Sequence, residues 1–216
     1  VPAGLYEVQV GGGRFGASNV DTFVVGALPE VLAPSDNTSQ EKAFEIEQGK
    51  TITGKAVARN YSYFKFNAKK GQELLIHCAA EEIDSNLAPV INILDADGNE
   101  LASETTTGIL DFSPVADGEY LIQLFDFLYG GSDLHYFQLT VSERPHIDFV
   151  DPPIGKPGTK ARFTLYGRNL PEGQSSGLKL PNGRLLDKKE VEIHLPGNPD
   201  EKDPAKLIGK VGPQQM

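Results

Sequence analysis

Short runs of alternating apolar and polar residues, separated by Gly, Pro, Asn and Asp, recur along most of the chain. Residues 118–125 place Tyr120, Ile122 and Leu124 on one face of an extended segment, and residues 137–141 repeat the period of two. This alternation is typical of β-strands that bury one face. The two segments together predict the closing hairpin of a β-sandwich.

A turn signal, Asp117-Gly118, comes directly before the first of these segments. Tyr120 follows two residues after the glycine, as in the tyrosine corner of β-sandwiches, where the hydroxyl bonds back to the upstream backbone. The start of the chain repeats this arrangement with Gly4 and Tyr6. Residues 1–26 therefore predict the last hairpin of another sandwich.

The intervening residues show the same rhythm of short strands and turns, and no long segment shows the helical period of about 3.6 residues. The Asp97-Gly98 pair is a strong signal for a tight hairpin turn. We expect an all-β protein whose complete domain is a jelly-roll-type β-sandwich. The predicted organisation is a C-terminal hairpin over 1–26, a linker over 27–43, the sandwich over 44–143 and the N-terminal part of another sandwich over 144–216.

The composition narrows the function classes. The formal net charge of −10 and the pI near 4.9 argue against partners such as nucleic acid and anionic membrane surfaces, which need a basic footprint. No apolar run reaches the ~18–20 residues of a membrane span. Cys78 is the single cysteine, so no internal disulfide can form, and its phase with Leu74 and Ile76 predicts a buried side chain.

Three passages in the central domain carry a resemblance to a known family: Phe64 to Gln72, Ile93 to Gly98 and Ala116 to Tyr120. Their order and spacing resemble the bacterial pre-peptidase C-terminal (PPC) domain. That family is a jelly-roll-type β-sandwich appended to secreted peptidases and other exported proteins. The resemblance covers about residues 30–142 and implies an accessory module rather than an enzyme.

The flanking segments resemble immunoglobulin-like domains of the IPT/TIG type. Residues 4–8 with 23–25 are similar to the end of such a domain, and residues 147–150 with 165–170 are similar to the start of another. This succession resembles large secreted proteins of planctomycete-type bacteria. It implies a secreted, cell-surface or periplasmic location, with neighbouring domains of a larger chain as partners. The open strands of the two partial domains could also pair with each other, within one chain or between chains.

Calcium is the one cofactor that the resemblance implies, because collagen-binding relatives of the PPC domain hold calcium between the preceding linker and an acidic loop. The corresponding residues here are Glu30, Asp36 and Asn37 of the linker, with Asn60 in the loop. The loop has no carboxylate and carries Arg59, whereas calcium prefers several carboxylate oxygens. We expect no other cofactor.

Five aromatic residues are candidates for an exposed binding surface, because aromatic rings stack on sugars or on peptide groups. The alternative is that a neighbouring domain or the linker covers them. They are Tyr61, Tyr63, Phe125, Phe127 and Tyr129.

Catalysis has little support in the sequence. The four histidines show none of the short spacings of metal ligands, and no serine has the strand-turn-helix context of a nucleophile. We predict a non-catalytic structural or interaction module of a secreted bacterial multidomain protein. The alternative is a module that binds carbohydrate or fibrous protein, with or without calcium, as an accessory to an exported hydrolase.

Overall fold

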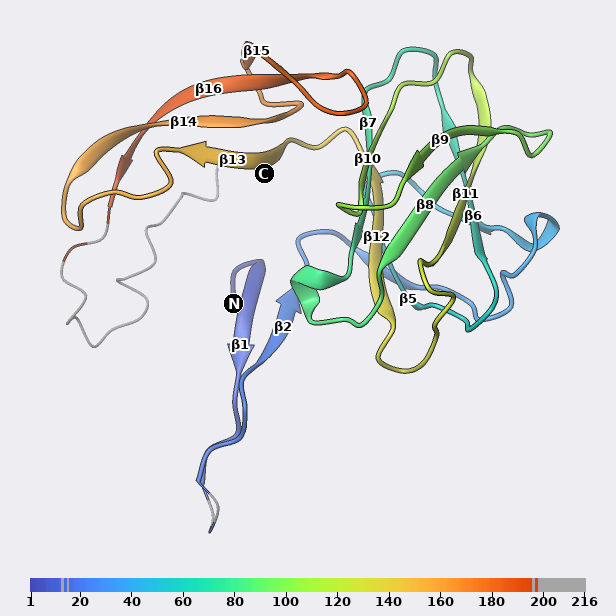
Figure 1. The fold of residues 1–216 in the computed structure, drawn as a ribbon, viewed down its shortest axis with the longest axis horizontal. Coiled ribbons are helices and arrows are strands. Elements are labelled where there is room, and N and C mark those ends of the chain that lie inside the picture. Colours follow the sequence, from blue (N-terminus) through green and yellow to red (C-terminus); the bar gives the residue numbers. More distant parts are fainter. Residues whose placement is uncertain (13, 15, 196, 198–216) are drawn as a thin grey trace. The chain divides into compact units, whose positions relative to one another are not determined.

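A computed structural model of the chain describes residues 1–12, 14, 16–195 and 197 (Figure 1). The chain divides into two compact units, Val1–Ser142 and Glu143–Met216. The domain predicted over 144–216 is described only in part, because residue 196 and residues 198–216 lie outside the described residues. Within the described part of the chain, no helix has the length and apolarity needed to cross a membrane.

The first unit contains a sandwich of two five-stranded sheets, in the orders β10-β7-β12-β5-β3 and β4-β6-β11-β8-β9. Nearly all neighbouring strands are antiparallel, and only two short one-turn helices interrupt them, so the predicted all-β fold is confirmed. The elements are β3 (Glu30–Leu32), η1 (Gln40–Lys42), β4 (Phe44–Glu45), β5 (Thr51–Lys55), β6 (Ser62–Ala68), β7 (Leu74–Ala79), η2 (Glu81–Ile83), β8 (Pro89–Leu94), β9 (Glu100–Glu104), β10 (Ile109–Phe112), β11 (Gly118–Asp126) and β12 (Tyr136–Ser142).

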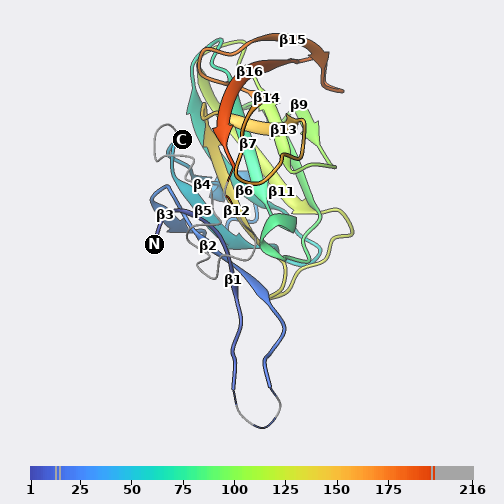
Figure 2. The same ribbon diagram turned by 90° about the vertical axis from the view of Figure 1, so that its left-hand side faces the viewer.

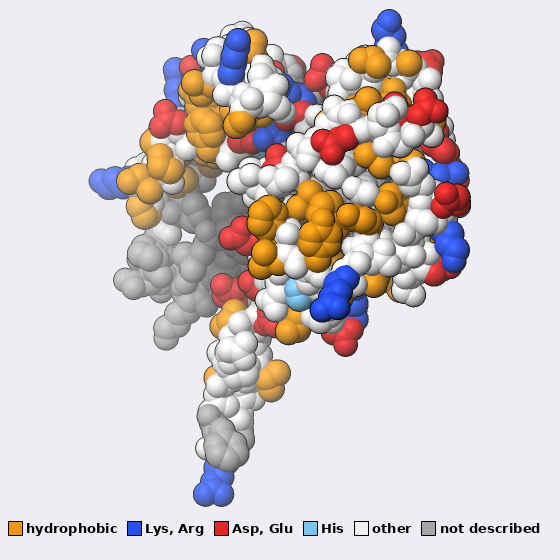
Figure 3. Space-filling model, turned by 45° about the vertical axis from the view of Figure 1, so that its right-hand side comes forward, with side chains coloured by type: hydrophobic (Ala, Val, Ile, Leu, Met, Phe, Trp, Pro, Cys, Tyr) orange, Lys and Arg blue, Asp and Glu red, His pale blue; other side chains and the backbone are white. Residues whose placement is uncertain are grey.

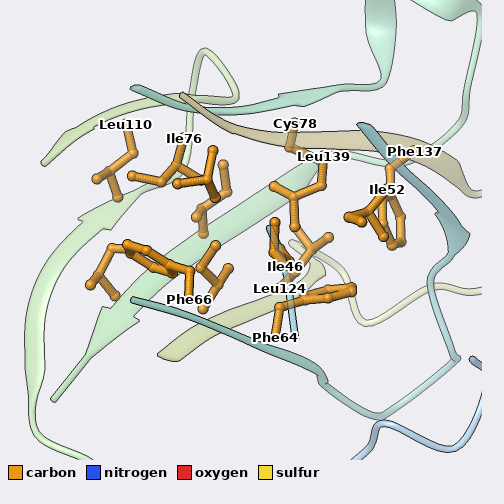
Figure 4. Packing of buried hydrophobic residues seen from close by; sticks show 14 of the residues in the cluster. Ile46, Ile52, Phe64, Phe66, Ile76, Cys78, Leu110, Leu124, Phe137 and Leu139 are labelled. Atoms are coloured by element: carbon orange, nitrogen blue, oxygen red, sulfur yellow. The ribbon is translucent and has the colours of Figure 1, made fainter. Parts of the chain in front are cut away.

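The core lies between the two sheets, where apolar side chains from facing strands interdigitate (Figure 4). Phe64 of β6 meets Phe137 of β12 edge to face, with ring centroids 6.0 Å apart. Ile76 and Leu139 are fully buried in the opposite sheet, as the alternating pattern predicts. Burying such side chains contributes about 25 cal/mol for each Å² of apolar surface removed from water. This packing is what holds the sheets together.

The predicted closing hairpin is wrong in one respect. Strand β11 pairs with β6 and β8, whereas β12 pairs with β5 and β7, so the two strands lie in different sheets. Residues 127–135 connect the two sheets, so they do not form the tight turn of a hairpin. The predicted tyrosine corner is confirmed at the start of β11, where the Tyr120 hydroxyl donates to the Ala116 carbonyl oxygen at 2.8 Å.

The segment 27–43 is part of the sandwich rather than a free linker. Its strand β3 pairs in parallel with β5, and Val31 packs against the core. Farther along, the buried Asn37 amide donates to the Tyr63 carbonyl oxygen at 2.9 Å, and the Tyr63 N–H donates back to the Asn37 carbonyl oxygen at 2.7 Å. The Pro and Ser content that predicted a linker is equally compatible with an extended edge segment.

The N-terminal hairpin consists of β1 (Gly4–Val8) and β2 (Asp21–Val25), paired antiparallel and drawn in dark blue in Figure 2. The Tyr6 hydroxyl donates to the Pro2 carbonyl oxygen at 2.7 Å. This bond spans four residues, as does the bond from Tyr120 to Ala116. The sequence repeat between the two segments therefore corresponds to a repeated local structure.

The second unit contains one four-stranded sheet in the order β13-β14-β16-β15. A buried ion pair joins Arg168 to Asp148 at 3.0 Å near one end of this sheet. Strands β13 and β14 overlap the segments 147–150 and 165–170 that were singled out in the sequence, whereas β15 was not predicted because its sequence is polar and Gly-containing. The strands are β13 (His146–Asp151), β14 (Lys160–Arg168), β15 (Gln174–Lys179) and β16 (Leu185–His194).

Candidate functional site: an aromatic cluster at one end of the sandwich

Three of the predicted aromatic residues form a cluster at one end of the sheet that contains β6 and β11. Tyr61 lies just before β6, and its ring meets Phe125 of β11 perpendicularly, with centroids 5.0 Å apart. Phe125 in turn stacks on Tyr129 at 5.2 Å with an interplanar angle of 25°. Tyr61 also makes an edge contact with Tyr129 at 6.2 Å. The structure thus brings together three of the five candidate residues, although they come from separate segments.

The buried carboxylate of Asp126 positions the loop that carries Tyr129. One oxygen accepts from the Ala88 N–H at 2.9 Å, and the other accepts from the N–H groups of Leu128 at 2.9 Å and Gly130 at 2.8 Å. Burial by itself raises the pKa of this carboxyl, but the three N–H donors outweigh burial and the pKa is lowered. Asp126 is therefore charged near neutral pH and holds the loop from within.

The loop is also locked against the segment before β6. The Arg59 N–H donates to the Tyr129 carbonyl oxygen at 3.0 Å. Gly131 approaches the backbone of Ala58 so closely that an added Cβ would lie 2.1 Å from its nitrogen. Tyr129 itself has φ of 56°, a conformation that L-residues rarely adopt. The cluster is therefore built on two interlocked loops rather than on independent ones.

Part of this surface is open to solvent. Phe127 is 58% exposed and Tyr129 is 45% exposed, and Leu128 between them is also exposed. Figure 3 shows hydrophobic side chains gathered into a continuous area on one face of the first unit. Tyr61 and Phe125 are half-buried. The pKa of Tyr61 is raised, chiefly by a hydrogen bond with Tyr129.

Tyr63 was expected to be exposed, and this expectation is wrong. Its side chain is buried in a small cluster with Leu94 and Leu121. Tyr61 and Ala43, the latter from the segment predicted to be a linker, pack against this cluster. The Tyr63 hydroxyl accepts a hydrogen bond from the Gln123 amide at 2.8 Å. The Gln123 oxygen accepts from Asn92 at 3.0 Å, which extends a row of polar contacts across the sheet. We therefore leave Tyr63 out of the candidate surface.

The predicted calcium ligands are used in other ways. Glu30 accepts a hydrogen bond from the Thr53 hydroxyl, and Asp36 lies 3.6 Å from the Lys42 ammonium group. The Asn37 amide is buried against β6, as described above. The remaining candidate, Asn60, accepts from the Tyr61 N–H at 2.9 Å.

Calcium requires about six to eight oxygen ligands that converge on one point. Among the described residues, no three carboxylate, imidazole or thiol groups are close enough together to hold a metal ion. The predicted ligands therefore do not fit a calcium site, and we derive no function from one.

Groups with nucleophilic potential serve structural roles. Cys78 is fully buried, and burial raises the pKa of its thiol far above the usual value, which disfavours the reactive thiolate. Ser132 and His135 lie 2.8 Å apart near Asp126, a grouping that sequence reasoning missed. However, the Ser132 hydroxyl accepts from the Leu134 N–H at 3.1 Å, and the Asp126 oxygens accept from backbone donors. The hydrogen bonds of Ser132 and His135 therefore stabilise the turn that these residues form.

No protein-family model matches the chain, and no curated protein matches it. Solved structures do. The PPC domain of collagenase from Bacillus anthracis is 18% identical with a TM-score of 0.38, and the match covers 46% of this chain and 93% of that domain. A periplasmic inhibitor of g-type lysozyme from Aeromonas hydrophila is 13% identical with a TM-score of 0.37, over 53% of this chain and 99% of that one.

A third likeness covers more of this chain but little of the other protein. The structure of the M60 catalytic domain with two CBM51 domains from Clostridium perfringens ZmpB is 12% identical, with a TM-score of 0.29, over 91% of this chain and 26% of that one. All three TM-scores lie below 0.5, so these likenesses carry no argument about ligands or activity.

Proposed function

We propose that this chain is a non-catalytic interaction module of an exported bacterial multidomain protein, as the PPC-like motifs in its sequence imply. One observation supports this proposal above others. The polar groups that a catalytic site would need, above all the Asp126 carboxylate and the Cys78 thiol, are buried and committed to the fold. A module of this kind would space, orient or anchor the domains beside it.

A second candidate function, the binding of carbohydrate or fibrous protein, is favoured by the aromatic surface. Phe127 and Tyr129 present apolar rings to solvent, while Asp126 and Gly131 hold their loop in place. A pre-positioned aromatic surface loses little conformational entropy when it binds, and stacked rings are suited to the apolar faces of sugars and to peptide rings. The surface is small, so we expect weak binding that several neighbouring modules would strengthen.

Co-sedimentation tests both functions. The protein would be mixed with cellulose, chitin, xylan and fibrillar collagen, each with calcium and with a chelator. Retention on one of these, lost in Phe127→Ala and kept in Val115→Ala, would establish the binding module. Val115 is a suitable control because it is 78% exposed in the turn before β11.

If the protein is retained on none of the four polymers, the role of spacing or orienting the neighbouring domains remains. A reproducible hydrolytic activity of the purified protein toward any of them would contradict the proposal of a non-catalytic module. Because calcium is varied in the same experiment, a dependence of retention on calcium would contradict our conclusion that Glu30, Asp36, Asn37 and Asn60 form no site.

A further inference from the structure

A straight row of uncharged polar side chains crosses the sheet that contains β6, β11, β8 and β9. The Ser103 hydroxyl donates to the Asn92 oxygen at 2.8 Å, and the Asn92 amide donates to the Gln123 oxygen at 3.0 Å. The Gln123 amide donates in turn to the Tyr63 hydroxyl at 2.8 Å. Neighbours in this row are direct cross-strand partners, so it spans three strand spacings of about 4.8 Å, or roughly 14 Å. We call Ser103, Asn92 and Gln123 the amide row.

The amide row lies on the face of the sheet that points away from the core. Ile93 and Ile122, next to Asn92 and Gln123 in the sequence, are fully buried between the sheets. Successive side chains of a strand point to opposite faces, so the amides point outward. Ser103 is exposed, and the two amides are half-buried. A ligand can therefore reach the row from solvent.

The hydrogen bonds within the row orient each amide and leave part of its bonding capacity for a ligand. A primary amide has two N–H donors and two lone pairs on its oxygen. Among the described residues, Asn92 and Gln123 each use one N–H and one lone pair in the row. One donor and one lone pair remain on each amide. This combination matches a hydroxyl group, which both donates and accepts.

The amide row lies directly beside the aromatic cluster. Phe125 follows Gln123 by two residues on the same face of β11, about 7 Å along the strand. Tyr129 stacks on Phe125, and its loop also presents the exposed ring of Phe127. A sugar unit has apolar C–H faces and hydroxyl groups at its edge, so rings beside amides match both of its surfaces.

The absence of charge within the amide row bears on the class of ligand. On the same face of the sheet, Lys65 and Glu119 pair with each other at 3.0 Å. A charged polymer would therefore find no opposite charge in the row itself. Collagen would satisfy the row less well than a sugar chain, because its many prolines have no N–H to donate to the amide oxygens.

We propose that the amide row is the polar part of a binding site for a neutral polysaccharide, whose sugar units stack on the aromatic cluster and hydrogen-bond to Gln123, Asn92 and Ser103. This inference rests on the binding function proposed above and narrows the class of its ligand. Tyr63 is a positioning residue in this site, because it holds the Gln123 amide and is itself buried.

Three substitutions test the role of the row. Gln123→Leu removes the amide and keeps a side chain of similar size. Ser103→Ala is a second variant at an exposed position, which keeps the test valid if Gln123→Leu folds poorly. Asn67→Leu is the matched control, because Asn67 is an exposed amide on the same face of β6 that lies outside the row.

Native electrophoresis in gels that contain a dissolved polymer gives the dissociation constants. The neutral polymers are hydroxyethyl cellulose, glucomannan and arabinoxylan, polygalacturonate is the anionic one, and co-sedimentation with fibrillar collagen is run in parallel. We expect binding to at least one neutral polymer. Gln123→Leu should raise the dissociation constant about tenfold and Ser103→Ala about threefold, whereas Asn67→Leu should leave it unchanged.

The outcomes separate this inference from the binding function on which it rests. Binding to a neutral polymer that Phe127→Ala weakens, but Gln123→Leu and Ser103→Ala do not, would overturn the role of the amide row and leave the aromatic surface as the binding site. Binding to collagen or to polygalacturonate alone would overturn the neutral polysaccharide as the ligand. If none of these polymers binds, the binding function fails and this inference fails with it.

Discussion

The hydroxyl of Tyr120 donates a hydrogen bond to the carbonyl oxygen of Ala116 at 2.8 Å, across the turn that leads into β11. The ring of the same tyrosine is buried against Phe112, with centroids 5.0 Å apart, and stacks on Phe66 at 6.0 Å. One side chain thus fastens the turn and fills the core below it. The stability of the sandwich depends on side chains that, like Tyr120, both form a hydrogen bond and pack against their neighbours.

The Tyr120→Phe variant removes the hydrogen bond and keeps the ring in the core. We expect the free energy of unfolding to fall by about 1 kcal/mol, the usual net value of such a bond. Urea denaturation followed by tyrosine fluorescence measures this. Tyr6→Phe removes the equivalent bond in the hairpin and should leave the transition of the sandwich unchanged. Equal destabilisation by both variants would show that hairpin and sandwich unfold together.

Asp126→Ala should destabilise the sandwich by about 3 kcal/mol, because it leaves three partly buried N–H donors without their acceptor. Asp133→Ala is the control in the same loop. Its carboxylate pairs with Lys55 at 2.7 Å but is almost fully exposed, and such exposed pairs contribute little to stability. Comparable losses in the two variants would contradict the anchoring role of Asp126.

Gly131→Ala tests the interlocking of the two loops. A Cβ at this position would lie 2.1 Å from the Ala58 nitrogen and 2.7 Å from the Ala56 carbonyl oxygen, so backbone must shift. We expect a loss of at least about 2 kcal/mol. Gly118→Ala should cost much less, because nothing lies within 4 Å of its Cβ position. Thermal melting of the two variants side by side gives the comparison, and similar melting temperatures would argue against tight loop contact.

The lowered pKa of Glu82 implies a specific loss of stability at acidic pH. A hydrogen bond from His77 lowers the pKa of this carboxyl to about 2, against the opposing effect of burial, and the Ala80 N–H contributes further. Since the folded pKa lies below the usual value of 4.5, the charged form stabilises the fold above that pH. This stabilisation disappears as the pH falls toward 2.

The Glu82→Gln variant should therefore be less stable than the parent protein at neutral pH, and the difference should shrink on acidification. Denaturant titrations at a series of pH values test this. A difference between the two proteins that stays constant down to pH 2 would contradict the assignment.

Phe127→Ala separates binding from stability. Since the ring is 58% exposed and lies beyond the end of β11, we expect the free energy of unfolding to change by no more than about 0.5 kcal/mol. If the aromatic surface binds a polymer, affinity should fall by about tenfold, as for a central aromatic contact. Tyr61→Ala should lower both, because Tyr61 also packs on Phe125. An unchanged affinity in both variants would exclude this surface.

The sequence predicts the layers of this fold better than their connections. Alternation identifies the buried faces correctly, as Phe64 and Ile76 show, because the period of two is a property of each strand alone. It does not reveal that β11 and β12 belong to different sheets, since pairing depends on distant partners. For the same reason it does not reveal that β3 joins the sheet in parallel beside β5.

In the candidate site, too, the sequence predicts features that are local to a strand but not contacts between distant segments. Phase along the strand selects Phe125 for this site, because it falls on the face opposite Leu124. The burial of Tyr63 was missed, since its cluster with Leu94 and Leu121 forms only after folding and includes a contact from Ala43, in a segment with linker-like composition. The role of Asp126 was also missed. Its donors Leu128 and Gly130 are close in the sequence, but the Ala88 donor is 38 residues away and becomes a neighbour only after folding. An aspartate near the end of a strand has the same appearance in the sequence whether it is solvated or buried.

The parallel strand β3 brings the two ends of the sandwich together. Glu30 and Thr140 both pair with Thr51, one on each side, so the chain enters and leaves the sandwich at the same level. Two strand spacings of about 4.8 Å separate these points, a distance that an ordinary surface loop can span. Residues 30–142 thus have the geometry of a transplantable insert, which could be placed in a loop of an unrelated protein without forcing its flanks apart.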